Sequence, residues 1–140
     1  MKYYAILDTN VLVSAMLKRG SVPNHVVMEA LNGDIIPVLN EEIFSEYEEV
    51  LKRPKFKFNT ESVRVFRVFL EELKYRAIYS DVALVEENII DANDVVFYAV
   101  LMEVRKEEEA YLVTGNLRHF PVRTYIVTPK EMLDILRETK

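Results

Sequence analysis

Acidic side chains at three separate places in the chain could together support metal-dependent chemistry. Asp8 directly follows an apolar stretch, Glu46 stands within an acidic helical pattern, and Asp94 stands near an expected helix start. Clustered carboxylates repel one another, and a fold keeps such a cluster mainly when a hard divalent cation such as Mg²⁺ or Mn²⁺ neutralises it. A metal held in this way activates a bound water and stabilises charge on a phosphodiester, so we expect hydrolysis of phosphodiester bonds.

Two of these acids have neighbours in the sequence that could take their place. Glu46 stands among several glutamates, which a solvated helix face would also explain, so its role could move to Glu42 or Glu49. Asp91 competes with Asp94, because either aspartate could simply cap the helix that follows. We predict that Glu46 and Asp94 carry the chemistry.

Polar residues after a second apolar stretch are expected to join Asp8. Asp8 ends the apolar segment 2–7, and the tripeptide Thr114-Gly115-Asn116 follows the apolar segment 110–113. Sites in parallel α/β sheets gather at the carboxyl ends of the strands. Asp8 and this tripeptide are therefore predicted to lie on one rim of the sheet.

The elements that must position these residues follow from hydrophobic periodicity and capping signals. Short runs of β-branched, aromatic and aliphatic residues predict strands at 2–7, 35–39, 78–79, 110–113 and 125–127. Helical spacing predicts helices at 10–19, 23–32, 40–53, 60–76, from 91 or 93 to the charge run 105–109, and after the capping box at 128–131. Strands separated by helices favour right-handed crossovers, hence an α/β fold with a mostly parallel central sheet and helices on both faces.

Composition limits the class of protein. With 140 residues, half of them apolar, the chain is expected to form one domain over residues 1–140. It has no cysteine, which excludes disulfides and thiolate sites, and no apolar run of about 20 residues that could span a bilayer. The N-terminus is unlike a secretory signal, so we expect a cytoplasmic protein without a membrane segment. The net charge of −5 opposes nucleic-acid binding unless local cations and bound metal offset it.

Four motifs in order resemble the PIN-domain family, and more narrowly its VapC-like toxin ribonucleases. They are LDTNVLVSA, SEYEEVLKRPKF, DANDVVFYAV and YLVTGNLRHFP, which together span nearly the whole chain. The resemblance implies a three-layer α/β/α fold and Mg²⁺- or Mn²⁺-dependent endonucleolytic cleavage of single-stranded RNA. It also implies an antitoxin protein that covers the acidic cleft, and a homodimer. The acidic ligands that it implies are Asp8, Glu46 and Asp94, with Asp91 as a further acid.

One position departs from the family pattern. Many PIN domains have an aspartate two residues after the threonine, where this chain has Asn116. An amide can still contribute to a metal site by orienting a bound water, but it adds no charge. This change leaves a second hypothesis, a catalytically weakened or inactive PIN-like module that binds RNA or protein. A third, a haloacid-dehalogenase-type phosphatase, is disfavoured because Asn10 stands where that chemistry needs a second aspartate.

Residues around the acids are expected to support the site or to contact RNA. Thr9, Asn10 and Thr114 are candidates for holding or capping the acidic residues. The segment 52–58, KRPKFKF, suits phosphate contact and base stacking, although its phenylalanines could instead be core residues. The cations with this expectation are Arg53 and Lys55, and near the rim Lys18, Arg19, Arg118 and Arg123.

The two histidines and one charge run complete the survey. His119 lies in the loop after Asn116 and could touch the substrate, although packing beside Phe120 is the simpler explanation. His25 is expected to be an ordinary surface or packing residue. The charge run 105–109 is interpreted as a solvated helix end without function.

Overall fold

A parallel sheet of five strands forms the centre of the molecule. The computed structural model describes residues 3–53 and 60–138. The strands are paired in the order β3-β2-β1-β4-β5, and every pair is parallel. Their bounds are β1 Tyr3–Leu7, β2 Ile35–Leu39, β3 Ile78–Tyr79, β4 Ala110–Val113 and β5 Ile126–Val127. The two central strands, β1 and β4, are paired in the register Tyr4 to Ala110 through Leu7 to Val113.

Helices connect the strands as the capping signals predict. Asn40 caps α3 by accepting a hydrogen bond from the Ile43 backbone N–H at 2.8 Å. The capping box at 128–131 forms in both directions, since Thr128 and Glu131 each accept the other's backbone N–H. The helices are α1 Thr9–Leu17, α2 Val22–Asn32, α3 Glu41–Leu51, α4 Thr60–Arg76, α5 Val95–Val104 and α6 Pro129–Glu138, with 3-10 turns η2 at Ala92–Asp94 and η3 at Leu117–His119.

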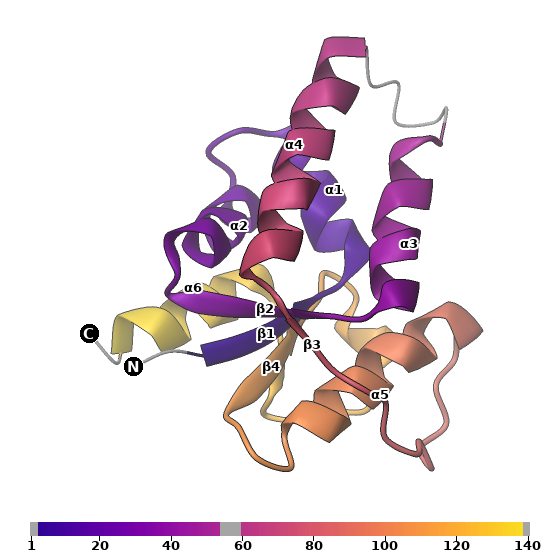
Figure 1. Ribbon diagram of the computed structural model, residues 1–140. Coiled ribbons are helices and arrows are strands. Elements are labelled where there is room, and N and C mark those ends of the chain that lie inside the picture. The colour runs from indigo at the N-terminus through magenta and orange to yellow at the C-terminus, as the bar shows by residue number, and fades with distance from the viewer. Residues whose placement is uncertain (1–2, 54–59, 139–140) are drawn as a thin grey trace.

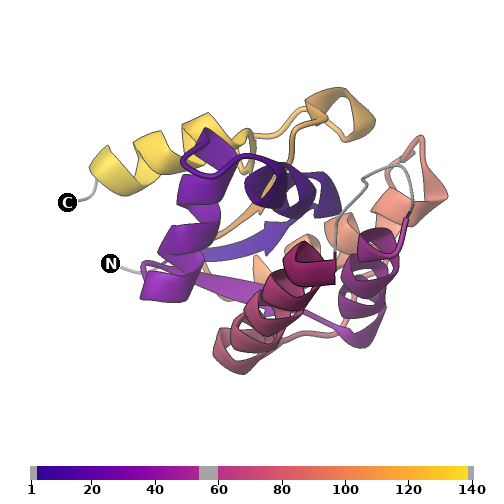
Figure 2. The same cartoon turned by 90° about the horizontal axis from the view of Figure 1, so that it is seen from above.

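The helices form layers on both faces of the sheet. In Figure 1, α5 lies on one face, and α1, α2 and α4 lie on the other. The view from above shows α2 beside α6, with which it is in contact (Figure 2). The predicted α/β architecture with helices on both faces is confirmed, and the sheet is wholly parallel.

Several local predictions need correction. Helix α1 ends at Leu17 and not at residue 19, and the last strand begins at Ile126 and not at residue 125. The apolar spacing of residues 60–76 would also place Val68 in the core, but its relative exposure is 66%. Apolar spacing alone could not decide this, because α4 carries more apolar side chains than its packed face can cover.

The core is continuous from the sheet into the helix layers. It includes the inward side chains of β1, β2 and β4 and the apolar sides of all the long helices. Within the described residues, none of the helices combines the length and apolar character that a membrane span requires.

Candidate active site

Asp8 lies at the carboxyl end of β1, beside the end of β4. Its backbone N–H donates to the Val113 carbonyl at 2.9 Å, which extends the β1–β4 ladder by one residue. The side chain is only 6% exposed and accepts hydrogen bonds at Oδ2 from Thr114 Oγ1, at 2.7 Å, and from Asn10 Nδ2, at 3.2 Å. The carboxylate is therefore held in one orientation by groups from two strand ends.

The loop after β4 is fixed by the same residues. Thr114 Oγ1 accepts the Asn116 backbone N–H at 3.0 Å, so its own proton is directed to Asp8. Asn10 Oδ1 accepts the Gly115 backbone N–H at 3.1 Å, which joins the start of α1 to this loop. The side chain of Asn116 makes no capping bond to the η3 turn that follows it.

Helix α3 brings Glu46 to the same rim. The Thr9 hydroxyl donates a hydrogen bond to Glu46 Oε2. The next residue, Tyr47, is buried and donates from its hydroxyl to the Leu7 carbonyl at 2.5 Å. This bond fixes α3 against the end of β1. By contrast, Glu42 and Glu49 are exposed on the same helix.

The turn before α5 contributes two further acids. Asp91 is exposed and caps η2 by accepting the Asn93 backbone N–H at 2.9 Å. Asp94 is half-buried, and its Oδ2 lies 3.2 Å from Nδ1 of His119 in η3. His119, which the sequence left open as a structural or substrate residue, thus contacts an acid of the site.

The acids influence one another electrostatically. Burial raises the pKa of Asp8, the hydrogen bond from Thr114 opposes this shift, and the charge of Asp94 adds to it. Burial likewise raises the pKa of Glu46, against the bond from Thr9, and the charge of Asp8 raises it further. Burial and the nearby charge of Asp91 raise the pKa of Asp94, while His119 lowers it. Each of these carboxylates therefore lies close enough to another acid for its ionisation to be opposed.

A cation that relieves this repulsion would suit the available donors. The oxygen-only set of carboxylates, a hydroxyl and an amide is chemically suited to Mg²⁺ or Mn²⁺. The side chains are nevertheless not assembled into a closed cage: over residues 3–53 and 60–138, no group of three His, Cys, Asp or Glu side chains is placed to hold a metal ion. The arrangement fits a hydrated ion bound through one or two carboxylates, as is usual for Mg²⁺.

The cations expected to contact RNA differ in their placement. Arg53 is exposed just after α3, and its charge lowers the pKa of Glu46, so it lies near the site. Arg118 is exposed in η3, next to His119. The guanidinium of Arg123 instead lies 3.8 Å from the carboxylate of Glu87, which is not one of the acids of the site. Lys55 and residues 54–59 as a whole lie outside the described residues.

The structure thus brings together most of the predicted residues, and adds one that the sequence analysis did not assign to the site. Asp8, Thr9, Asn10 and Thr114 are directly hydrogen-bonded within the site, and Glu46, Asp94 and His119 join them. The additional residue is Tyr47, whose place in the helical pattern of residues 40–53 suits an apolar core position. The available signal was its hydroxyl, because a buried tyrosine hydroxyl usually needs a partner.

Comparison with known proteins identifies one family. The family model for the PIN domain matches residues 4–118, which include both strand ends and all the acids of the site. Neither the curated proteins nor the solved structures gave a significant match. PIN domains are generally nucleases, and they generally use divalent metal ions.

Proposed function

Because the chain belongs to the PIN-domain family, we propose that it is a Mg²⁺- or Mn²⁺-dependent endoribonuclease that hydrolyses phosphodiester bonds of single-stranded RNA. The observation that carries this proposal is that Asp8, Glu46 and Asp94 come together at the carboxyl ends of β1 and β4, where burial and neighbouring acidic charges raise their pKa values. Such repulsion costs stability unless a cation is bound, so a resident metal explains why the fold tolerates it.

The residues of this chain would divide the work between holding and positioning. Asp8, Glu46 and Asp94 would hold the metal. Asp91, which lies three residues before Asp94, and Asn116, which lies two residues after Thr114, would assist them. When bound, the metal supplies an activated water and charge stabilisation on the phosphodiester. Thr114 and Asn10 orient Asp8, Thr9 orients Glu46, and His119 orients Asp94.

Substrate binding would use the exposed cations near the acids. Arg53 and Arg118 flank the site from α3 and η3, and a guanidinium suits a phosphate oxygen pair. A single strand is preferred because its phosphates and bases are free to follow an irregular surface.

The decisive experiment is cleavage of an end-labelled single-stranded RNA by highly purified protein. The reactions contain Mn²⁺, Mg²⁺ or a chelator, and Asp8→Asn and Asp94→Asn serve as contamination controls. We expect metal-dependent cleavage that both substitutions abolish. Equal cleavage by wild type and variants, or none with any metal, would refute the proposed activity.

The second candidate is a PIN-like module that binds RNA or protein without cutting. Two observations favour it: Asn116 in place of an acid, and the lack of a closed three-residue metal group among the described side chains. RNA binding that is retained in a chelator, together with no cleavage by wild type, would support this candidate over the nuclease.

The biological role that we propose is the toxin of a toxin–antitoxin pair, with an antitoxin peptide that covers the acidic cleft. A free ribonuclease would harm its own cell, so expression of the chain alone should slow growth, and Asp8→Asn should relieve the defect. Abundant expression of active wild-type protein without any growth defect would count against this role.

We also propose a homodimer. Support comes from apolar side chains left exposed along α4, namely Val65, Val68 and Tyr75. Light scattering should give twice the chain mass, and Val68→Glu should shift the protein toward the monomer. A monomeric mass for wild type at all concentrations tested would exclude the dimer.

A further inference from the structure

A groove of about 360 Å³ lies away from the acidic rim. Its base is formed by Tyr4 near the start of β1, and its walls are β3 with the two residues that follow, and the end of α5 with the turn before β4. Asp8 stands at the other end of β1. The volume is within the range of sites that hold small ligands, roughly 300–1,000 Å³.

The groove exists because one helix covers this face of the sheet. Helix α5 packs on β1 and β4 and leaves the face beside β3 without a helix (Figure 1). Both walls are nevertheless fixed: Ser80 donates its backbone N–H to the Leu39 carbonyl at 3.0 Å, and Ala83 donates to the Ala99 carbonyl at 3.0 Å. On the other side, the backbone N–H groups of Glu107 and Glu108 both donate to the Val104 carbonyl, at 3.1 and 3.0 Å. The groove is therefore preformed.

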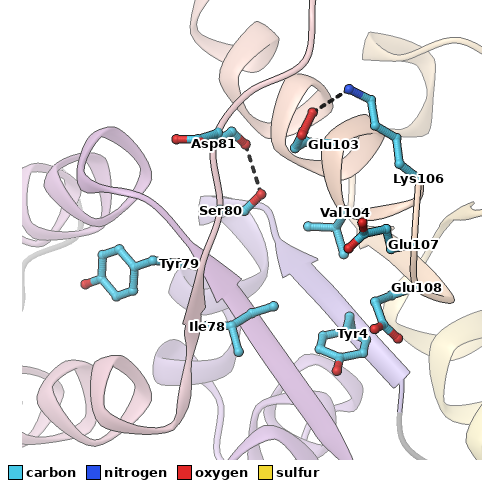
Figure 3. Close-up of a pocket in the computed structure, with 10 residues that line it drawn as sticks. All are labelled: Tyr4, Ile78, Tyr79, Ser80, Asp81, Glu103, Val104, Lys106, Glu107 and Glu108. Carbon is cyan, nitrogen blue, oxygen red and sulfur yellow. Dashed lines mark hydrogen bonds and ion pairs between the residues drawn. The ribbon is translucent and has the colours of Figure 1, made fainter.

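The lining has an acidic side and an apolar side. Figure 3 shows Glu107 and Glu108 near Val104, at the end of α5 and in the turn that follows, and Ile78 on the opposite side, on β3. Ile78 is 39% exposed. Four acids and one lysine line the groove, a net charge of −3. The lysine, Lys106, is paired with Glu103 at 2.6 Å.

The remaining acids of the groove have no cationic partner among the described residues. In the described part of the chain, Asp81, Glu107 and Glu108 take part in none of the ion pairs. Acids on one side of the groove and Ile78 on the other match a segment that carries both basic and apolar side chains. The methylene stems of lysine or arginine can cover Ile78 and Tyr4 while their charged ends meet the acids.

We propose that this groove is a docking site for an extended, basic segment of a partner protein that also carries an apolar residue. Charge complementarity selects this occupant. Nucleic acid is excluded because its phosphates would meet a net negative lining. A second copy of this chain, with a net charge of −5, is electrostatically disfavoured. A free polyamine would satisfy the acids but leave Ile78 uncovered.

The test measures binding of a short, capped, fluorescein-labelled peptide in which lysines flank leucines. The same peptide with glutamate in place of lysine tests the contribution of charge. Spermidine, used as a competitor, tests whether positive charge is sufficient without apolar contact to Ile78. Fluorescence anisotropy gives the affinity, and hydrogen exchange locates the protected backbone. We expect binding of the lysine peptide alone, weak competition by spermidine, and protection at residues 78–81 and 103–108.

Variants decide whether the groove itself binds the peptide. Glu107→Lys/Glu108→Lys should weaken binding at least about tenfold, since two favourable charge contacts become repulsive. Ile78→Ala should weaken it severalfold by removing apolar contact. The matched control is Glu48→Lys/Glu49→Lys, which makes the same change in net charge on the exposed side of α3.

Three outcomes would overturn the proposal. They are no binding of the lysine peptide, equal loss in the groove and control variants, and protection confined to the acidic rim around Asp8. Spermidine binding as tight as the peptide would identify a polyamine site instead. Circular dichroism of each variant verifies that folding is retained, so that lost binding is not lost structure.

Discussion

The molecule has two acidic regions near opposite ends of β1, and their carboxylates differ in burial and in solvation. At the rim, Asp8 is almost fully buried, and neutral hydroxyl and amide donors satisfy it. In the groove, Glu107 and Glu108 are exposed to solvent. Buried acids interact strongly through a low-dielectric surrounding, whereas exposed acids are screened by water and salt.

The difference separates two kinds of function. A partly buried cluster stores repulsion that a small ion of high charge density can relieve, and its neighbours fix its geometry for chemistry. An exposed cluster stores little energy and acts instead as a complementary surface for a larger partner. Acidity alone therefore does not indicate a metal site, and the burial of each carboxylate must be known.

The largest effect that would sharpen this contrast is loss of cleavage in Glu46→Gln. Removing the charge while keeping the shape should lower kcat/KM by at least about 100-fold, because the proposed metal site would lose one of its carboxylates. Glu49→Gln is the control, since Glu49 is exposed on the same helix. Similar kinetics for the two variants would show that Glu46 is only part of a solvated face.

A smaller effect is expected when a positioning group is removed at the rim. Thr114→Val keeps the volume but removes the donor to Asp8 and the acceptor for the Asn116 N–H. Cleavage should fall by about tenfold, and Thr114→Ser should restore most of it. The exposed Thr124→Val is the control for threonine loss. Undiminished cleavage by Thr114→Val would mean that Asp8 needs no orientation.

Two tyrosine hydroxyls, one buried and one at the surface, are expected to contribute differently to the free energy of unfolding. Tyr47→Phe leaves the Leu7 carbonyl without its buried donor and should lower the free energy of unfolding by about 1–3 kcal/mol. Tyr111→Phe removes a hydroxyl that bonds Glu109 at the surface and should cost less. Urea unfolding measures both. Equal losses would contradict the placement of Tyr47 as the bond that fixes α3 to β1.

The smallest effect concerns pH dependence without metal. The folded-state pKa of Asp8 lies above its ordinary value of 3.8, so its contribution to stability is fully present below that value. This contribution is lost as the pH rises through the raised folded pKa. Asp8→Asn should therefore melt a few °C higher than wild type at neutral pH in a chelator, with the difference shrinking toward pH 4.

A carboxylate of the groove is the control for this melting experiment, and added metal is expected to reverse the order of stability of wild type and Asp8→Asn. Glu108→Gln should leave the melting temperature nearly unchanged at every pH, because an exposed carboxylate is well solvated. Added Mn²⁺ should stabilise wild type and not Asp8→Asn. If metal does not change the melting temperature of wild type, or if Asp8→Asn is less stable than wild type, the carboxylates of the site do not repel one another as proposed.

Much of the fold was predictable because its signals are local. Asn40 and the 128–131 capping box act within three residues, so sequence spacing is sufficient to identify them. The strand ends at Asp8 and Thr114 were predictable for a topological reason, since parallel strands bring their carboxyl ends to one edge. The choice among Glu42, Glu46 and Glu49 was not settled by periodicity, because all three lie on one broad helix face.

What the sequence by itself determined is the set of elements, their order and the residue types at the strand ends. Tertiary structure alone decided which groups meet: Thr9 with Glu46, Tyr47 with Leu7, and Thr114 with Asp8 are separated by 37, 40 and 106 residues. It also turned Glu107 and Glu108, at first interpreted as a solvated helix end, into a wall of the groove. The physical reason is range: propensity and capping act over a few residues, whereas burial, and the pKa shifts that follow from it, depend on how distant segments pack.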